Sequence, residues 1–69
     1  MIISNHAIKR FQERVTEGTF EFIKSFIQRE LTQSVLLYSL NGVEKHYVRG
    51  IVYIVEKQTV ITLYPSVIE

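Results

Sequence analysis

The apolar residues of this chain change their spacing at about Gln33, and that change restricts the folds it can adopt. Before Gln33 they recur every three or four positions, which is the spacing of one face of an α-helix. After it, short runs rich in β-branched and aromatic residues are separated by pairs of turn-forming residues, as in antiparallel strands. We therefore predict an α+β fold in which two N-terminal helices are followed by a four-stranded antiparallel β-meander.

The helical part begins after residues 1–3, which we expect to form a short extended segment. Ser4 and Thr19 are predicted N-caps, because their hydroxyls can accept a hydrogen bond from an amide of the first turn. The two helices are predicted over about residues 5–15 and 20–31. Their apolar faces consist of Ala7, Ile8, Phe11 and Val15 in the first, and Phe20, Ile23, Phe26, Ile27 and Leu31 in the second.

Three short turns separate the predicted strands. Asn41-Gly42 strongly indicates a two-residue hairpin turn, because both residue types tolerate a positive φ. Arg49-Gly50 and Lys57-Gln58 are the expected second and third turns. The strands then span about residues 35–40, 43–48, 51–56 and 59–64, and their ends pair Leu40 with Val43, Val48 with Ile51 and Glu56 with Thr59.

Both faces of the predicted sheet are rich in apolar residues. We assign the helices to the face that carries Leu36, Leu40, Val43, Tyr47, Val52, Ile54, Ile61 and Leu63. The second face carries Val35, Leu37, His46, Val48, Ile51, Tyr53, Val55, Val60, Thr62 and Tyr64. Because a large apolar face is usually buried in an interface, we predict a homo-oligomer, a dimer or larger, formed through the sheet by this second face. The alternatives are helices that cover both faces and a register slip that mixes them.

The composition excludes several kinds of protein. The 69 residues predict a single domain over residues 1–69, and they include no cysteine, which excludes disulfides and thiolate zinc sites. Two histidines make a poor metal site, so we expect neither a metal nor a cofactor. A net charge of +1 argues against binding to duplex DNA. Because we see no signal-peptide pattern and no apolar run that could span a bilayer, we expect a cytoplasmic location and no membrane partner.

His6, Arg10 and Arg14 are spaced four residues apart in the first predicted helix and so share one face of it. Imidazole can transfer a proton near neutral pH, and the guanidinium group matches the oxygens of a phosphate. The three residues are therefore a candidate anion-binding site, and candidate catalytic residues if the chain cleaves RNA. The alternative is a solvated charged face in which Arg10 pairs with Glu13 or Glu17.

A second candidate site lies in the predicted sheet. In the predicted register Leu37, His46, Tyr53 and Thr62 form one cross-strand row, with Tyr64 nearby. A row of His, Tyr and Thr side chains can bind a base or shuttle a proton. It can equally be a polar strip inside a dimer interface, which is the interpretation that we favour.

Other basic and aromatic residues extend these two candidate sites. We expect Arg49 and Lys45 on the helix side of the sheet, where they would complete a basic patch with the arginines of the first helix. Tyr38, Tyr47, Tyr53 and Tyr64 are able to stack on bases. In a small sheet, however, tyrosines more often fill the core and the edges. We include Arg49, Tyr53 and Tyr64 among the candidate binding residues.

Three stretches of the chain resemble a known family. Residues 4–14, S-N-H-A-I-K-R-F-Q-E-R, resemble the S-x-H-A-x-x-R-x-x-x-R start of a family of small uncharacterised bacterial and phage domains. That family is grouped with the RelE-like and BrnT-like toxin ribonucleases. Residues 46–55, H-Y-V-R-G-I-V-Y-I-V, and 60–65, V-I-T-L-Y-P, resemble its strand, glycine turn and closing strand. The resemblance covers nearly the whole chain.

The resemblance implies a compact sheet with helices on one side and, for the catalytic relatives, metal-independent cleavage of RNA. In that chemistry a base removes the proton of the 2′-hydroxyl, which attacks the adjacent phosphate, while Arg or Lys stabilises the developing charge. The residues that match the family are His6, Arg10 and Arg14 in the opening motif, and Gly50, Tyr64 and Pro65 in the sheet portion.

Two functions of different classes are open. We favour a small binding or inhibitory module of the phage or mobile-element type, which oligomerises through its sheet and captures a host protein or an anionic nucleotide-like ligand. The near-neutral charge, the small size and the apolar second face support it. The alternative is a RelE-like or BrnT-like ribonuclease toxin, with His6 or His46 as the proton-transfer group and Arg10 and Arg14 on the phosphate. A purely structural oligomer is a third possibility.

Overall fold

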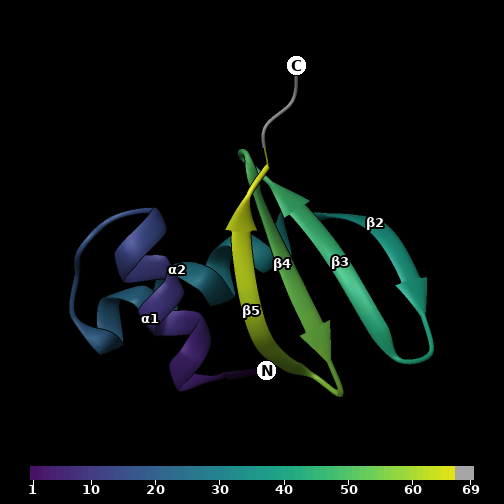
Figure 1. The fold of residues 1–69 in the computed structure, drawn as a ribbon, viewed down its shortest axis with the longest axis horizontal. Helices are drawn as coiled ribbons and strands as arrows, with labels where there is room; N and C mark the ends of the chain where they lie inside the picture. Colours follow the sequence, from purple (N-terminus) through teal and green to yellow (C-terminus); the bar gives the residue numbers. More distant parts are fainter. Residues whose placement is uncertain (67–69) are drawn as a thin grey trace.

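A computed structural model describes residues 1–66 and places two helices beside a five-stranded sheet (Figure 1). The predicted α+β class is confirmed. In chain order the elements are β1 (Ile2–Ile3), α1 (Asn5–Arg14), α2 (Phe20–Thr32), β2 (Val35–Leu40), β3 (Val43–Val48), β4 (Ile51–Glu56) and β5 (Thr59–Pro65). The helices and the four longer strands begin and end within one residue of the predicted positions.

Both helices begin at the predicted caps. The Ser4 hydroxyl accepts a hydrogen bond from the Ala7 amide at 3.0 Å, and the Thr19 hydroxyl accepts one from the Phe22 amide at 3.2 Å. The Ser4 hydroxyl also donates to the Ile61 carbonyl in β5 at 3.2 Å. Ser4 therefore both starts α1 and joins it to the sheet.

The three turns between the long strands have the backbone shape that their sequences predict. All six turn residues have a positive φ, between 49° and 83°, including the non-glycine pair Lys57-Gln58. A positive φ at both turn positions is the type I′ geometry, whose twist matches that of the flanking strands. The three predicted pairings beside these turns, Leu40 with Val43, Val48 with Ile51 and Glu56 with Thr59, are confirmed.

The sheet has one strand more than predicted, because Ile2 and Ile3 form β1. β1 pairs with β5 in parallel and the strand order is β1-β5-β4-β3-β2, so the sheet is mixed rather than purely antiparallel. The Ile2 amide donates to the Gln58 carbonyl at 2.9 Å, and the Ser4 amide donates to the Val60 carbonyl at 3.0 Å. Two residues are too few to show the period of a strand, so the sequence indicates only an extended segment here.

Two β-bulges shift the predicted register inside the strands. One lies at Leu37 in β2 and the other at Ile61 in β5. A bulge adds one residue to one strand of a pair, and the side chains beyond it change face relative to the simple alternation. The predicted cross-strand row of Leu37, His46, Tyr53 and Thr62 is therefore wrong, and the observed row is Leu36, His46, Tyr53 and Leu63.

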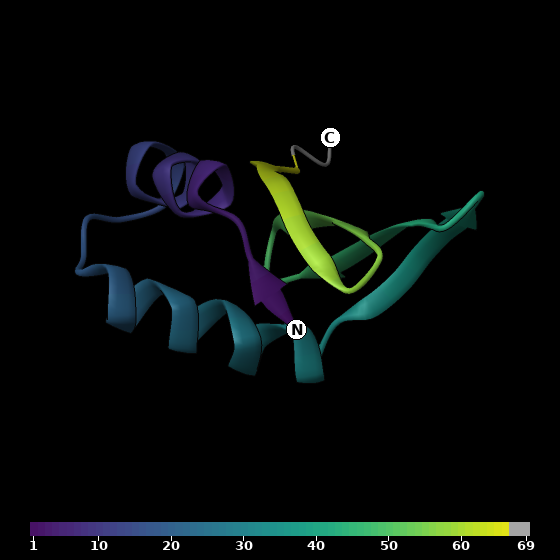
Figure 2. The same ribbon diagram turned by 90° about the horizontal axis from the view of Figure 1, so that it is seen from below.

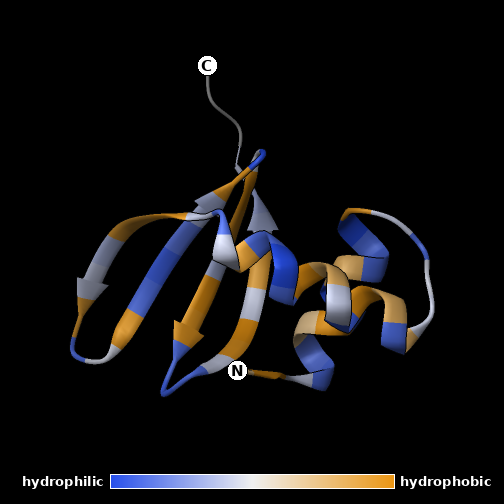
Figure 3. Ribbon diagram, turned by 180° about the vertical axis from the view of Figure 1, so that it is seen from behind, coloured by the Kyte–Doolittle hydropathy of each residue, from blue (hydrophilic) through white to orange (hydrophobic). Residues whose placement is uncertain are grey.

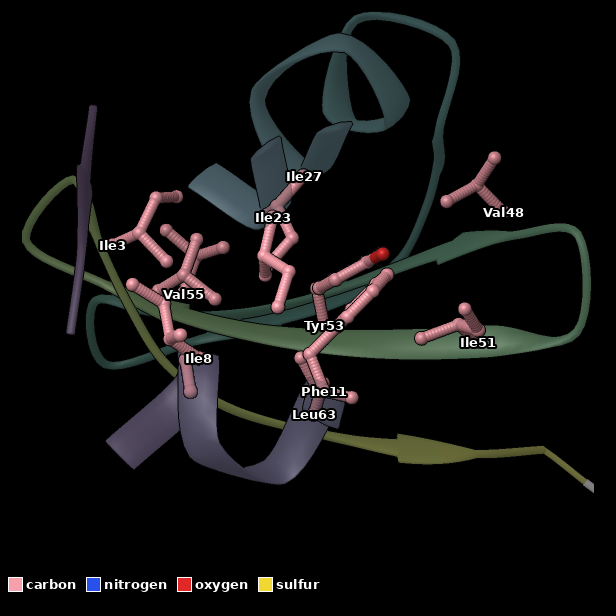
Figure 4. Packing of buried hydrophobic residues seen from close by; sticks show 12 residues of the cluster. Ile3, Ile8, Phe11, Ile23, Ile27, Val48, Ile51, Tyr53, Val55 and Leu63 are labelled. Atoms are coloured by element: carbon pink, nitrogen blue, oxygen red, sulfur yellow. The ribbon is translucent and has the colours of Figure 1, made fainter. Parts of the chain in front are cut away.

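The helices cover the sheet face opposite to the one predicted for them. The core joins helix residues Ala7, Ile8, Phe11, Ile23 and Ile27 to sheet residues Ile3, Val48, Ile51, Tyr53, Val55, Val60 and Leu63 (Figure 4). Most of these sheet residues belong to the face predicted to meet another subunit. The face assignment is wrong, and so is the prediction of a subunit interface on that face, because the chain's own helices bury it. Both faces are apolar, so alternation alone does not distinguish them.

The face turned away from the helices contains side chains that shield one another. Val52 lies on it, because its neighbours along β4 point into the core, and Val52 is only 3% exposed. Its partners on the adjacent strands are Tyr47 and Tyr64, which flank it. Lys45 lies on this face too, with its Nζ 5.6 Å from the centre of the Tyr38 ring. The prediction that Lys45 lies on the helix side is therefore wrong.

Candidate functional site

His6 and Arg10 lie next to each other on the solvent side of α1, as their spacing predicts. Arg10 Nε donates to His6 Nε2 at 3.4 Å, and Arg10 Nη1 is 3.5 Å from Oε1 of Glu13. Glu13 therefore offsets part of the charge of Arg10, as in the solvated-face alternative. The Nε2 lone pair of His6, which a general base would use, already accepts a hydrogen bond. Arg14 is exposed at the end of the same helix.

His46 is largely buried in β3, and both of its ring nitrogens have partners. Nδ1 is 3.3 Å from Ser34 Oγ, and Nε2 is 3.0 Å from Oε1 of Glu44. The Ser34 hydroxyl donates its hydrogen to the Leu31 carbonyl at 2.8 Å, so it can only accept from Nδ1. His46 therefore ties β3 to the end of α2.

Glu30 of α2 is a buried carboxylate that our reading of the sequence missed. It is 5% exposed, and Arg49 Nε lies 3.6 Å from its Oε2. Arg49 also donates from Nη2 to Gln33 Oε1 at 3.2 Å, so it joins the end of α2 to the turn between β3 and β4. A signal for Glu30 was present in the sequence. It follows Ile23 by seven residues and Ile27 by three, and so occupies a position in the apolar stripe of the helix.

Tyr53 carries the other unusual polar group of this region. Its side chain is completely buried in the core (Figure 4), and its hydroxyl has no hydrogen-bond partner among residues 1–66. Burial raises the pKa of Tyr53 above the usual range of a tyrosine, and the charge of Glu30 raises it further. Tyr53 therefore stays neutral and closed to solvent, so its ring cannot stack on a base.

The predicted binding residues do not come together in one place. α1 carries one pair, the end of α2 gathers a second group, and Tyr64 lies on the opposite face of the sheet. Two shallow hollows are lined by other residues, namely Gln12, Glu13, Glu17 and Gly18 in one, and Met1, Gly42, Glu44, Val55, Lys57 and Gln58 in the other. Within residues 1–66, no three His or Glu side chains are grouped to hold a metal ion. None of the helices in that part of the chain is long and apolar enough to cross a membrane.

β2 is an apolar strand whose six residues, V-L-L-Y-S-L, are all exposed. The five large ones are between 47% and 60% exposed. Figure 2 shows why: the hairpin of β2 and β3 extends away from both helices, and β2 forms the outer edge of the sheet. In Figure 3 hydrophobic residues continue along β2, outside the part of the sheet that lies next to the helices. Such an exposed apolar edge is typical of a surface that binds another chain.

No protein-family profile matches this chain, and no curated protein and no solved structure matches it significantly. The resemblance of residues 4–14 to the toxin ribonucleases therefore stays a prediction. The function of the chain therefore has to be inferred from its surfaces. Two of them are the basic face of α1, formed by His6, Arg10 and Arg14, and the edge strand β2, which holds the longest run of exposed apolar residues within residues 1–66.

Proposed function

We propose that the chain is a binding module that oligomerises through its sheet and captures a host protein, and that it is not an enzyme. The observation that carries this proposal is β2, an apolar strand exposed along its whole length at an edge of the sheet. An edge strand presents unpaired amides and carbonyls, and exposed apolar side chains beside them favour pairing with another chain. Association through β2 would remove both groups from water.

The kind of partner follows from the charges. Residues 33–43, which contain β2 and the turn after it, include no charged side chain, and the whole chain has a net charge of +1. Phosphate-bearing ligands are held mainly by Lys and Arg. The exposed strand therefore suits a protein better than a nucleotide or RNA, and we place a host protein ahead of an anionic ligand as the captured partner.

The basic face of α1 supports the same choice. An RNA-cleaving site needs a base with an available lone pair and cations directed at the phosphate. Here Arg10 is shared between His6 and Glu13, and the second histidine, His46, is held in the sheet by Ser34 and Glu44. An inhibitory module needs no such group, because occupying a surface of its target is enough.

The ribonuclease is the second candidate, and one observation favours it. His6 and Arg10 are adjacent on the solvent side of α1, where a strand of RNA has access to them. This candidate predicts that the purified chain cleaves RNA without a metal ion. It also predicts that His6→Ala/Arg10→Ala abolishes the cleavage.

The two candidates are separated by comparing His6→Ala/Arg10→Ala with Leu36→Lys/Leu40→Lys. We expect total bacterial RNA to stay intact when incubated with the wild-type chain in EDTA. We also expect self-association, and any effect on the growth of an expressing host, to be lost in the β2 variant and kept in the α1 variant. RNA cleavage that disappears in the α1 variant would establish the ribonuclease instead.

A further inference from the structure

The two edges of the sheet differ in their protection against pairing with another strand. β1 has two residues, and a very short edge strand is one of the features by which proteins protect an edge. β2 has six residues, and none of them is a proline or carries a charge. Of the features that usually protect an edge strand, β2 has a bulge, at Leu37. Six residues of strand are about 20 Å long, which is enough for a row of hydrogen bonds to a second strand.

The occupant that fits this edge is a second copy of the chain. Because residues 33–43 are uncharged, two copies of β2 meet without like charges facing each other. The strand is also suited to pairing with itself in the antiparallel direction. With full overlap, Val35 faces Leu40 of the second copy and Leu37 faces its Tyr38. Two of the three kinds of pair therefore join apolar side chains, and the third sets Leu36 opposite Ser39.

We propose that two copies of this chain pair antiparallel along β2 and form a closed dimer with one continuous sheet. This proposal rests on the proposed function and names one of its partners. A two-fold axis between antiparallel neighbouring strands stands perpendicular to the sheet, so the helices of both copies lie on the same face. The pairing uses both β2 edges and leaves the two-residue β1 strands at the outside, which stops the assembly at two copies.

The exposed area is enough for a reversible dimer. The five large residues of β2 are about half exposed, and half of a side chain of this size is roughly 90 Å², so each copy offers up to about 450 Å². The total of about 900 Å² is below the roughly 1,200–2,000 Å² of stable specific interfaces and falls in the range of weak, transient ones. We therefore expect a dissociation constant in the micromolar range, and a surface that stays available to other partners at low concentration.

Sedimentation velocity tests the dimer between about 1 and 300 μM chain, a range that spans micromolar affinities. We expect the wild-type chain to shift from monomer to dimer across this range. Leu36→Lys and Leu40→Lys, which place a charge on β2, should each weaken dimerisation at least tenfold. The matched controls are Ile2→Lys on the opposite edge strand and Phe22→Lys on α2, both of which are similarly exposed and should dimerise as the wild type does.

Several results would overturn the dimer. One is a wild-type chain that stays monomeric at every concentration, and another is a dimer that persists in both β2 variants, which would place the contact on a different surface. Because the substituted side chains are exposed, we expect each variant to fold, and circular dichroism checks this. A different result would contradict the proposed function, namely RNA cleavage that depends on His6 and Arg10.

Cysteine cross-linking tests the strand direction separately. The chain has no cysteine of its own, so each introduced thiol is unique. Val35→Cys and Leu40→Cys chains that are mixed and mildly oxidised should form a disulfide between the two variants, because opposite residues of paired strands are close enough for one. Either variant oxidised by itself should stay uncross-linked. A disulfide in the Val35→Cys sample by itself would overturn the antiparallel register.

Discussion

The strands β4 and β2 have similar hydrophobicity and opposite surroundings. β4 reads I-V-Y-I-V-E, and four of its six residues are buried. β2 reads V-L-L-Y-S-L, and none of its residues is buried. The difference comes from their positions in the sheet, because β4 lies between two other strands and under the helices, whereas β2 lies at the edge beyond the reach of both helices. The residue composition favours a strand in both segments, but the order of the strands in the sheet determines which side chains are buried.

This comparison assigns different roles to the two halves of the molecule. The half that contains β4 and β5 stabilises the fold, since burial of its apolar side chains is the main source of folding free energy. In the hairpin of β2 and β3, β2 adds little buried area to that of β3. The apolar side chains of β2 are therefore left for association with another chain.

The largest effect is expected in the covered half. Phe11 is fully buried, and its ring lies 5.4 Å from that of Phe26. Phe11→Ala should cost about 3–5 kcal/mol, which is a large part of the roughly 3–10 kcal/mol expected for a chain of this length. Leu40→Ala on β2 should change the free energy of unfolding by less than about 0.5 kcal/mol. Urea unfolding at low micromolar concentration measures both, and a comparable loss in the two variants would contradict the division.

Hydrogen exchange should show the same difference without a substitution. The amides of β2 should exchange at least about tenfold faster than those of β4, because an edge strand with no covering side chains opens at a lower free energy. Raising the chain concentration should slow exchange in β2 and leave β4 unchanged if the dimer forms there. Equal protection of both strands in a dilute sample would show that β2 is part of the stable core.

A smaller loss is expected at the contact between α2 and the turn after β3. Arg49→Ala removes the cation beside the buried carboxylate of Glu30. It should lower the free energy of unfolding by about 1–2 kcal/mol, less than for a fully buried pair because the Arg49 side chain is exposed to solvent. Changing Glu30→Gln in the same chain should recover part of this loss, because no buried charge is then left without a partner. Arg14→Ala at the exposed end of α1 is the control, with an expected change near zero. The measurement is urea unfolding at neutral pH.

The smallest effect is expected for Tyr53→Phe. The substitution removes a buried hydroxyl without a partner, so it should raise the free energy of unfolding by up to about 1 kcal/mol at neutral pH. The folded chain holds the Tyr53 proton more tightly than the unfolded chain, whose tyrosines ionise near pH 10. The stabilisation of the folded chain that comes from this tighter binding of the proton is fully present below about pH 10. It is lost as the pH rises further, by up to about 1.4 kcal/mol per pH unit.

The wild-type chain should therefore lose more stability than Tyr53→Phe as the pH rises above about 10. Urea unfolding of both chains at mildly and strongly alkaline pH measures this difference. Identical pH profiles would show that Tyr53 ionises equally easily in the folded chain, and that its hydroxyl reaches water or a partner.

Features that depend on neighbouring residues were predictable from the sequence, and those that depend on distant ones were not. The caps at Ser4 and Thr19 and the positive-φ turns follow from local chemistry, and so does the contact of His6 with Arg10, because residues four apart on a helix are adjacent. The bulges at Leu37 and Ile61 have no comparable local signal.

The choice of the covered face needed information that alternation does not contain. Val52 and Tyr53 are both buried, one by its cross-strand tyrosines and the other by the helices, so a pattern of apolar residues cannot say which side the helices take. The candidate site shows the same limit. The sequence identified Arg49 and Tyr53 separately, but their common neighbour, Glu30, became visible once α2 was placed against the sheet.

The bond from Ser4 to Ile61 joins residues that are 57 positions apart, and the parallel pairing of β1 with β5 spans a similar distance. During synthesis, α1 leaves the ribosome long before the strand against which it packs. At about 5–20 residues per second, the chain waits roughly 3–10 s between making Ser4 and making β5. Until β5 has been made, the apolar face of α1 lacks the strand against which it packs. Synthesis of β5 is therefore required before α1 and β1 can reach their native packing.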